Sequence, residues 1–63
     1  MRIKVINTDS LPKYIIDKIE TTMIFTKWWE QNDTMFCQLE NSKGDIIRIF
    51  PERIKPIDLN ESL

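Results

Sequence analysis

Apolar and polar positions alternate along most of this chain, which is the pattern of half-buried β-strands. Residues 1–6 show it first, because Ile3 and Val5 occupy one phase while Arg2 and Lys4 occupy the other. Similar strand-like stretches are expected at residues 18–26, 35–40, 45–50 and 56–59. The pattern therefore predicts an all-β domain of five short strands.

Residues 11–20 fit two patterns. Leu11, Ile15 and Ile19 are spaced for one face of a helix, and the proline at position 12 would be tolerated in its first turn. Ile15 and Ile19 also share the parity of the strand that follows. We expect a loop or a short helix over residues 11–17, and a longer helix remains an alternative.

Turn residues separate the later strands. Residues 41–44 end in Gly44, the only glycine of the chain, which predicts a hairpin loop whose last position has a positive φ. Residues 31–33 are polar and predict another turn. Pro51 cannot donate to a β-ladder and should end the fourth strand, and residues 52–55 suit one helical turn.

The stretch Gly44–Ile57, which reads GDIIRIFPERIKPI, is similar to the closing strand, Pro-initiated turn and last strand of Src-homology-three-type small barrels, including bacterial relatives. Trp28-Trp29 resembles the tryptophan pair after the second strand of the peptide-binding members. The resemblance implies a five-stranded small barrel of this type. Trp28 and Pro51 match two groove residues of that family, but Ile54 replaces the groove tyrosine, so binding of Pro-rich peptides is not expected.

Composition narrows the function. The 63 residues include nine Lys and Arg and ten Asp and Glu, which gives a net charge of −1. This balance disfavours a protein that coats nucleic acid. The absence of histidine removes the common catalytic dyads and His-based metal sites, and no carboxylate pair has the spacing of a recognisable active site. We expect no enzymatic activity, no catalytic residue, no metal and no cofactor, and Cys37 should be a small buried apolar side chain.

The chain predicts one domain over residues 1–59 and a frayed tail over residues 60–63. Eleven Ile and no Ala indicate AT-rich coding DNA, as in a low-GC bacterium, its phage or another mobile element. No apolar run suits a signal peptide or a membrane span, so a cytoplasmic protein without membrane contact is expected.

Strand parity also suggests a binding surface. It places one cation and four large apolar side chains on the outer face, namely Trp28, Phe36, Ile46, Arg48 and Phe50. Such a patch is typical of partner-binding surfaces. By the same parity Trp29 belongs to the core, but a bulge near Lys27 would exchange the two tryptophans.

The favoured function is a non-catalytic protein-interaction module, such as a small adaptor or inhibitor. The alternative is a single-stranded nucleic-acid or ribosome-associated binding protein, for which the cations near the aromatic residues would be Lys27, Arg48, Arg53 and Lys55. A homodimer is a further expectation, formed through the apolar patch or through strand edges at residues 1–6 or 56–59.

Overall fold

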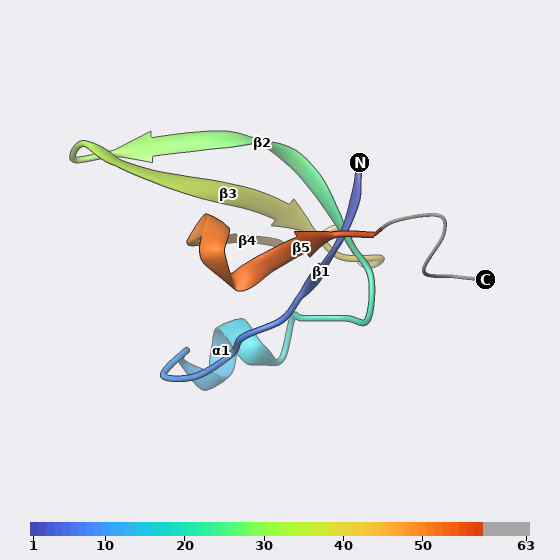
Figure 1. Cartoon of the computed structure of the whole chain (residues 1–63). Coiled ribbons are helices and arrows are strands. Elements are labelled where there is room, and N and C mark those ends of the chain that lie inside the picture. The colour runs from blue at the N-terminus through green and yellow to red at the C-terminus, as the bar shows by residue number, and fades with distance from the viewer. Residues whose placement is uncertain (58–63) are drawn as a thin grey trace.

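The computed structural model describes residues 1–57 as one antiparallel sheet of five strands with little helix (Figure 1). The strands are β1 (Arg2–Val5), β2 (Met23–Gln31), β3 (Thr34–Glu40), β4 (Ile46–Ile49) and β5 (Ile54–Pro56). The helical segments are α1 (Lys13–Ile16) and a 3₁₀ turn, η1 (Pro51–Arg53). The predicted all-β class is confirmed, and α1 lies inside the region where a short helix was expected. The longer helix to residue 20 does not form.

The strand order is β4-β3-β2-β1-β5, so β4 and β5 stand at opposite ends of the sheet. Within residues 1–57 these two strands do not pair, and the sheet is not closed into a barrel. β1 pairs with β2 on one side and with β5 on the other, which makes it an interior strand. The predicted exposed edge at residues 1–6 is therefore wrong. β5 begins two residues earlier than expected, and residues 58–63, with the expected end of that strand and the tail, lie outside the described part.

β2 differs most from its prediction, because it begins at Met23 and continues to Gln31 rather than covering residues 18–26. Its end is set by the turn at Asn32 and Asp33, whose φ angles are 52° and 61°. Two positive φ values suit the two-residue hairpin turn that matches the twist of paired strands. Pairing with β3 therefore extends to the turn, and this long hairpin projects beyond the other elements (Figure 1).

A β-bulge interrupts the pairing of β2 with β3. Phe25 lies opposite Leu39, but the next pair is Lys27 with Gln38, so Thr26 is an extra residue on β2. The Thr26 hydroxyl donates a hydrogen bond of 3.0 Å to the Gln38 carbonyl. A bulge reverses the side-chain phase of the strand beyond it. The alternative of a bulge near Lys27 is thus the one that the structure adopts.

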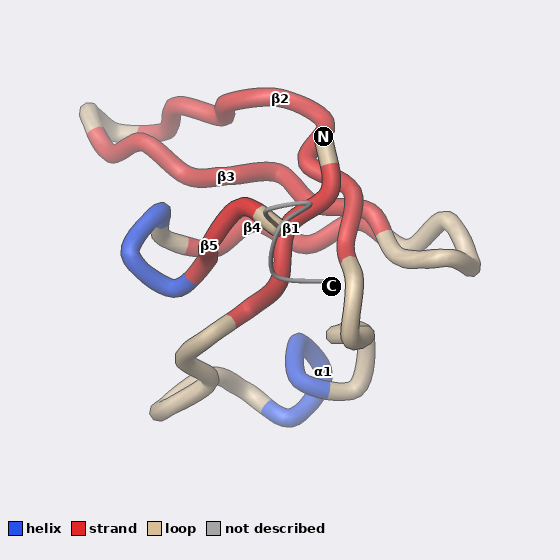
Figure 2. Tube along the Cα trace, turned by 45° about the vertical axis from the view of Figure 1, so that its right-hand side comes forward, coloured by secondary structure: helices blue, strands red, loops and turns tan. Residues whose placement is uncertain are grey.

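The core lies on one face of the sheet. Its fully or almost fully buried side chains are Ile3, Met23, Cys37, Leu39, Ile47 and Ile49. Leu11 and Ile15, from the connection that contains α1, pack against this cluster and cover it. Figure 2 shows that connection set to one side of the strands. Cys37 is buried as predicted, and its burial raises the pKa of the thiol.

Polar contacts order the β3–β4 loop. Asn41 is buried, and its Oδ1 accepts hydrogen bonds from the amides of Lys43 and Asp45, both at 2.9 Å. Glu20 accepts a bond of 2.8 Å from the Ser42 amide and one of 2.7 Å from the Ser42 hydroxyl. The two donors stabilise the charged carboxylate and lower the pKa of Glu20. The loop is thereby joined to the segment that precedes β2.

The Glu20–Ser42 contact predicts a pH-dependent stability. The pKa of Glu20 is lower in the folded chain than its ordinary value of 4.5, so its contribution is present above that value and is lost as pH falls through the folded pKa. In urea titrations from about pH 7 to about pH 3, wild type should lose more stability than Glu20→Gln. Ser42→Ala keeps the backbone donor, so its loss of stability should lie between those of wild type and Glu20→Gln. Parallel profiles for all three proteins would contradict the contact.

A second prediction concerns Gly44, which has a φ of +86° and open space where the Cβ of another residue would lie. Gly44→Ala should therefore destabilise through backbone strain alone, by about 1 kcal/mol. Urea titration measures this loss. The control is Lys43→Ala, which changes an exposed neighbour and should alter stability by less than about 0.5 kcal/mol. A substitution at Ser42 would not serve, because it would also remove a hydrogen bond.

Candidate interaction surface

The outer face of the sheet carries aromatic and cationic side chains from three strands. Beyond the bulge, Lys27 lies opposite Gln38 and Trp29 lies opposite Phe36. Gln38 in turn lies opposite Arg48 on β4. Directly opposite residues of an antiparallel pair point to the same face, so all five side chains share one face.

A chain of contacts holds Arg48 against Trp29. The Arg48 Nε donates a hydrogen bond of 3.1 Å to Gln38 Oε1, and Gln38 Nε2 donates one of 3.2 Å to the Thr26 hydroxyl. The Arg48 guanidinium carbon then lies 3.8 Å from the centroid of the Trp29 ring. Lys27 Nζ lies 5.4 Å from the same centroid. Both distances are within the range of cation–π attraction, so the cations are oriented by the ring and by the bulge.

Phe36 and Phe50 extend this cluster towards the end of β4. Their rings are stacked, with centroids 5.1 Å apart and planes inclined by 18°. Phe50 is 41% exposed, so the pair does not belong to the core. We name this cluster the outer aromatic surface and define it as Lys27, Trp29, Phe36, Arg48 and Phe50.

One polar atom of this surface lacks a partner. The Trp29 Nε1 is covered by its neighbours, and no acceptor for it is found among the described residues. A covered donor without an acceptor costs about 1–3 kcal/mol relative to a paired one. Trp29 is therefore not arranged for maximum stability of the free chain.

The structure brings together three of the five predicted partner-binding residues, Phe36, Arg48 and Phe50. Ile46 shares their face and is 39% exposed, but it lies nearer the β3–β4 loop, opposite Glu40. Trp28 requires a correction. It lies opposite Cys37, on the face of the core, where its ring contacts Phe25 edge-on at 5.3 Å.

Trp28 is nevertheless 56% exposed, because β2 extends beyond the core at this point. The prediction that Trp29 belongs to the core is also wrong. The bulge at Thr26 exchanges the faces on which the two tryptophans lie. The sequence contains a signal for this bulge. Strict alternation puts Lys27 in the phase of Met23 and Phe25, and an unpaired lysine on the core face is costly.

The four predicted nucleic-acid-binding cations do not form one row. Lys27 and Arg48 meet over Trp29, but Arg53 is held by the loop after β1. Its Nη1 donates to the carbonyls of Asn7, at 3.2 Å, and Asp9, at 2.8 Å. Lys55 lies on β5, at the end of the strand order opposite to β4.

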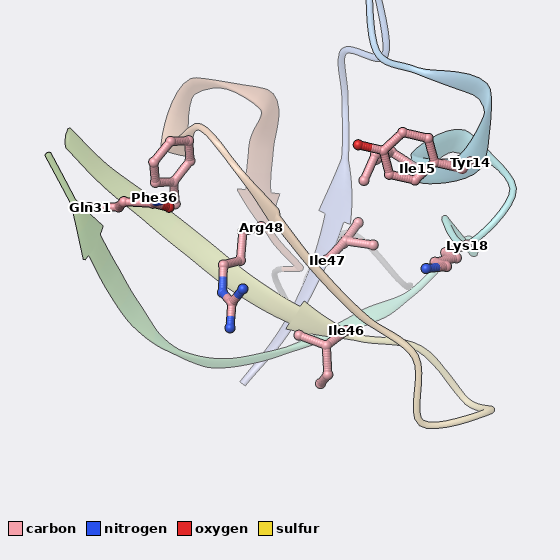
Figure 3. Close-up of a pocket in the computed structure, with 8 residues that line it drawn as sticks. All are labelled: Tyr14, Ile15, Lys18, Gln31, Phe36, Ile46, Ile47 and Arg48. Carbon is pink, nitrogen blue, oxygen red and sulfur yellow. The ribbon is translucent and has the colours of Figure 1, made fainter.

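A groove lies beside the outer aromatic surface, between β4 and the connection that contains α1. It consists of two adjoining hollows of about 340 and 330 Å³, near the lower end of the range for ligand sites. Tyr14, Ile15, Phe36 and Arg48 line both hollows. Figure 3 shows Tyr14 and Ile15 on one side of the first hollow, with Phe36 and Arg48 across from them. Sequence reasoning missed Tyr14 and Ile15, because nothing local to residues 11–17 indicates which strand they face.

Comparison of the chain with protein-family models, with curated proteins and with solved structures finds no match. Neither helical segment within residues 1–57 has the length and apolar character that crossing a membrane requires. In the same residues, no three His, Cys, Asp or Glu side chains gather closely enough to hold a metal ion.

The bulge predicts an energetic coupling between Arg48 and Trp29 that Trp28 does not share. A double-mutant cycle that combines Arg48→Met with Trp29→Ala should give about 0.5–1 kcal/mol of coupling, as expected for an exposed cation–π pair. The matched cycle with Trp28→Ala should give a value near zero. Urea titration of the single and double variants measures both. Coupling to Trp28 in place of Trp29 would show that the strand phase is reversed.

Proposed function

We propose that this chain is a non-catalytic protein-interaction module, a small adaptor or inhibitor that binds another protein through the outer aromatic surface. The observation that carries the proposal is the cluster of Trp29, Phe36, Phe50 and Arg48 on the face opposite the core. These side chains do not fill the core, so the fold does not require them there. Tryptophan and arginine are also the residues most enriched at the energetic centres of protein interfaces.

The arrangement of Arg48 supports the same proposal. Gln38 and the Trp29 ring hold the guanidinium in place before any partner arrives. A side chain that is already ordered loses less conformational entropy on binding.

We also propose that the sheet is an open form of the Src-homology-three-type barrel. The support is topological: β1 to β4 are antiparallel neighbours in chain order, β5 pairs with β1, and a 3₁₀ turn that begins at Pro51 joins β4 to β5. In the closed form, β4 would approach the connection between β1 and β2, where the groove now lies.

The alternative function is binding of single-stranded nucleic acid, and one observation favours it. Lys27 and Arg48 lie beside the aromatic rings, as phosphate-binding cations lie beside stacking platforms. It ranks second because Arg48 already covers the Trp29 ring and Arg53 is engaged by the loop after β1. Fewer aromatic faces are thus left for bases to stack on, and fewer cations are left for phosphates.

The test is capture of a partner by the immobilised chain from lysate of a low-GC bacterium, followed by titration with the purified partner. Phe50→Ala and Arg48→Gln should each weaken binding at least about tenfold, as truncation of interface centres does. Trp28→Ala is the matched control, because it removes an exposed ring of the other face and should change the affinity less than about twofold. Equal losses for all three variants would contradict the proposal.

The nucleic-acid alternative is tested in parallel by fluorescence anisotropy with short single-stranded DNA and RNA. Binding that falls steeply with salt and is reduced by Lys27→Gln would establish it. Together with the lack of a captured protein, that result would replace the first proposal. No change in anisotropy at low salt would eliminate the alternative.

A further inference from the structure

Within residues 1–57, β4 has a free edge, because it is the last strand of the sheet on its side. The Asn41 amide donates to the Asp45 carbonyl, at 3.0 Å, which makes Asn41 and Asp45 a hydrogen-bonded pair of the β3–β4 ladder. Such pairs alternate along an antiparallel ladder, so Ile47 bonds towards β3. The amides and carbonyls of Ile46 and Arg48 therefore point away from β3, towards the groove.

The groove follows this edge. Ile46, Ile47 and Arg48 line its first hollow, and Arg48, Ile49 and Phe50 line the second. Consecutive residues of a strand point to opposite faces, and Figure 3 shows Ile47 directed away from Arg48 and Ile46. A hollow lined by both sets runs along the edge of the strand rather than over one face. The groove is thus placed to receive a segment that pairs with β4.

The charges of the groove are of one sign. Its cationic residues are Lys18 in the first hollow, Arg48 in both and Arg53 in the second. No Asp or Glu of the described residues lines either hollow, although acidic residues outnumber basic ones in the whole chain. The only hydrogen bond that Arg48 makes within residues 1–57 through its side chain uses Nε, so its two Nη groups remain for a carboxylate. An anionic occupant complements this groove.

We propose that the partner contributes an extended acidic segment, which enters the groove and pairs with β4 as a sixth strand. This inference rests on the proposed function and specifies the element of the partner that is recognised. Backbone pairing to Ile46 and Arg48 provides affinity, and carboxylates directed to Lys18 and Arg48 provide specificity. A second copy of the chain fits less well, because it would bring the same cations to the same edge.

The experiment selects ligands from a display library of random peptides about six residues long, the usual length of a strand. Selected peptides should be enriched in Asp and Glu. Hydrogen exchange followed by NMR should show that the Ile46 and Arg48 amides exchange readily in the free chain and become protected when peptide is added. The Ile47 and Ile49 amides, which bond to β3, should be protected throughout.

Two variants separate this inference from the proposed function. Ile46→Pro removes an amide that faces the groove and leaves the hydrogen bonds to β3 in place. It should weaken the affinity for a selected peptide about tenfold. Lys18→Gln removes a groove cation outside the outer aromatic surface and should weaken the affinity for the peptide about two- to fivefold. Lys43→Gln removes a cation of the exposed hairpin loop and should leave this affinity unchanged. Circular dichroism verifies that each variant is folded.

The inference is overturned if selection yields no binders, if the binders are not acidic, or if bound peptide leaves the Ile46 and Arg48 amides unprotected. The proposed function has a separate readout. A protein partner that is lost with Phe50→Ala but binds Ile46→Pro and Lys18→Gln normally would retain the function and reject the strand-pairing mode. Loss of that partner with the groove variants as well would support both.

Discussion

From Ile24 to Gln31, β2 contains one residue more than the stretch of β3 with which it pairs, and Thr26 is that residue. Its hydroxyl bonds to the backbone of Gln38 and also accepts from the Gln38 side chain, so the extra residue is held in place. The reversal of phase that follows takes Lys27 off the core face. It also brings Trp29 beneath Arg48, and the outer aromatic surface depends on this change.

The core needs only one face of the sheet, and this leaves the other face free for a second purpose. Six buried side chains from four strands form the core, and the connection with α1 covers it. Arg53 holds the start of that connection by bonding to carbonyls at Asn7 and Asp9. A cation that sequence alone would assign to ligand binding thus has a structural task, and the wall of the groove opposite β4 depends on it.

An unclosed sheet leaves its end strands with unpaired backbone groups, and these normally carry a risk of aggregation. At β4 this risk is limited by the cations that line the groove and by the α1 connection across it. In the binding mode that we propose, the same features favour a segment of opposite charge. The absence of a strand on this side among residues 1–57 and the concentration of cations there are therefore parts of one arrangement.

The sequence by itself determined the features that depend on neighbouring residues. Alternation identified the all-β class and the shared face of Phe36 with Arg48, Gly44 marked the hairpin, and Pro51 marked the end of β4. Only the tertiary structure decided which tryptophan joins that face, because a bulge is defined by pairing with another strand. Strand order, the task of Arg53 and the groove beside Tyr14 were likewise undetermined, since each depends on residues far apart in the chain. Local patterns encode which side chains alternate, whereas the packing of distant segments decides what they face.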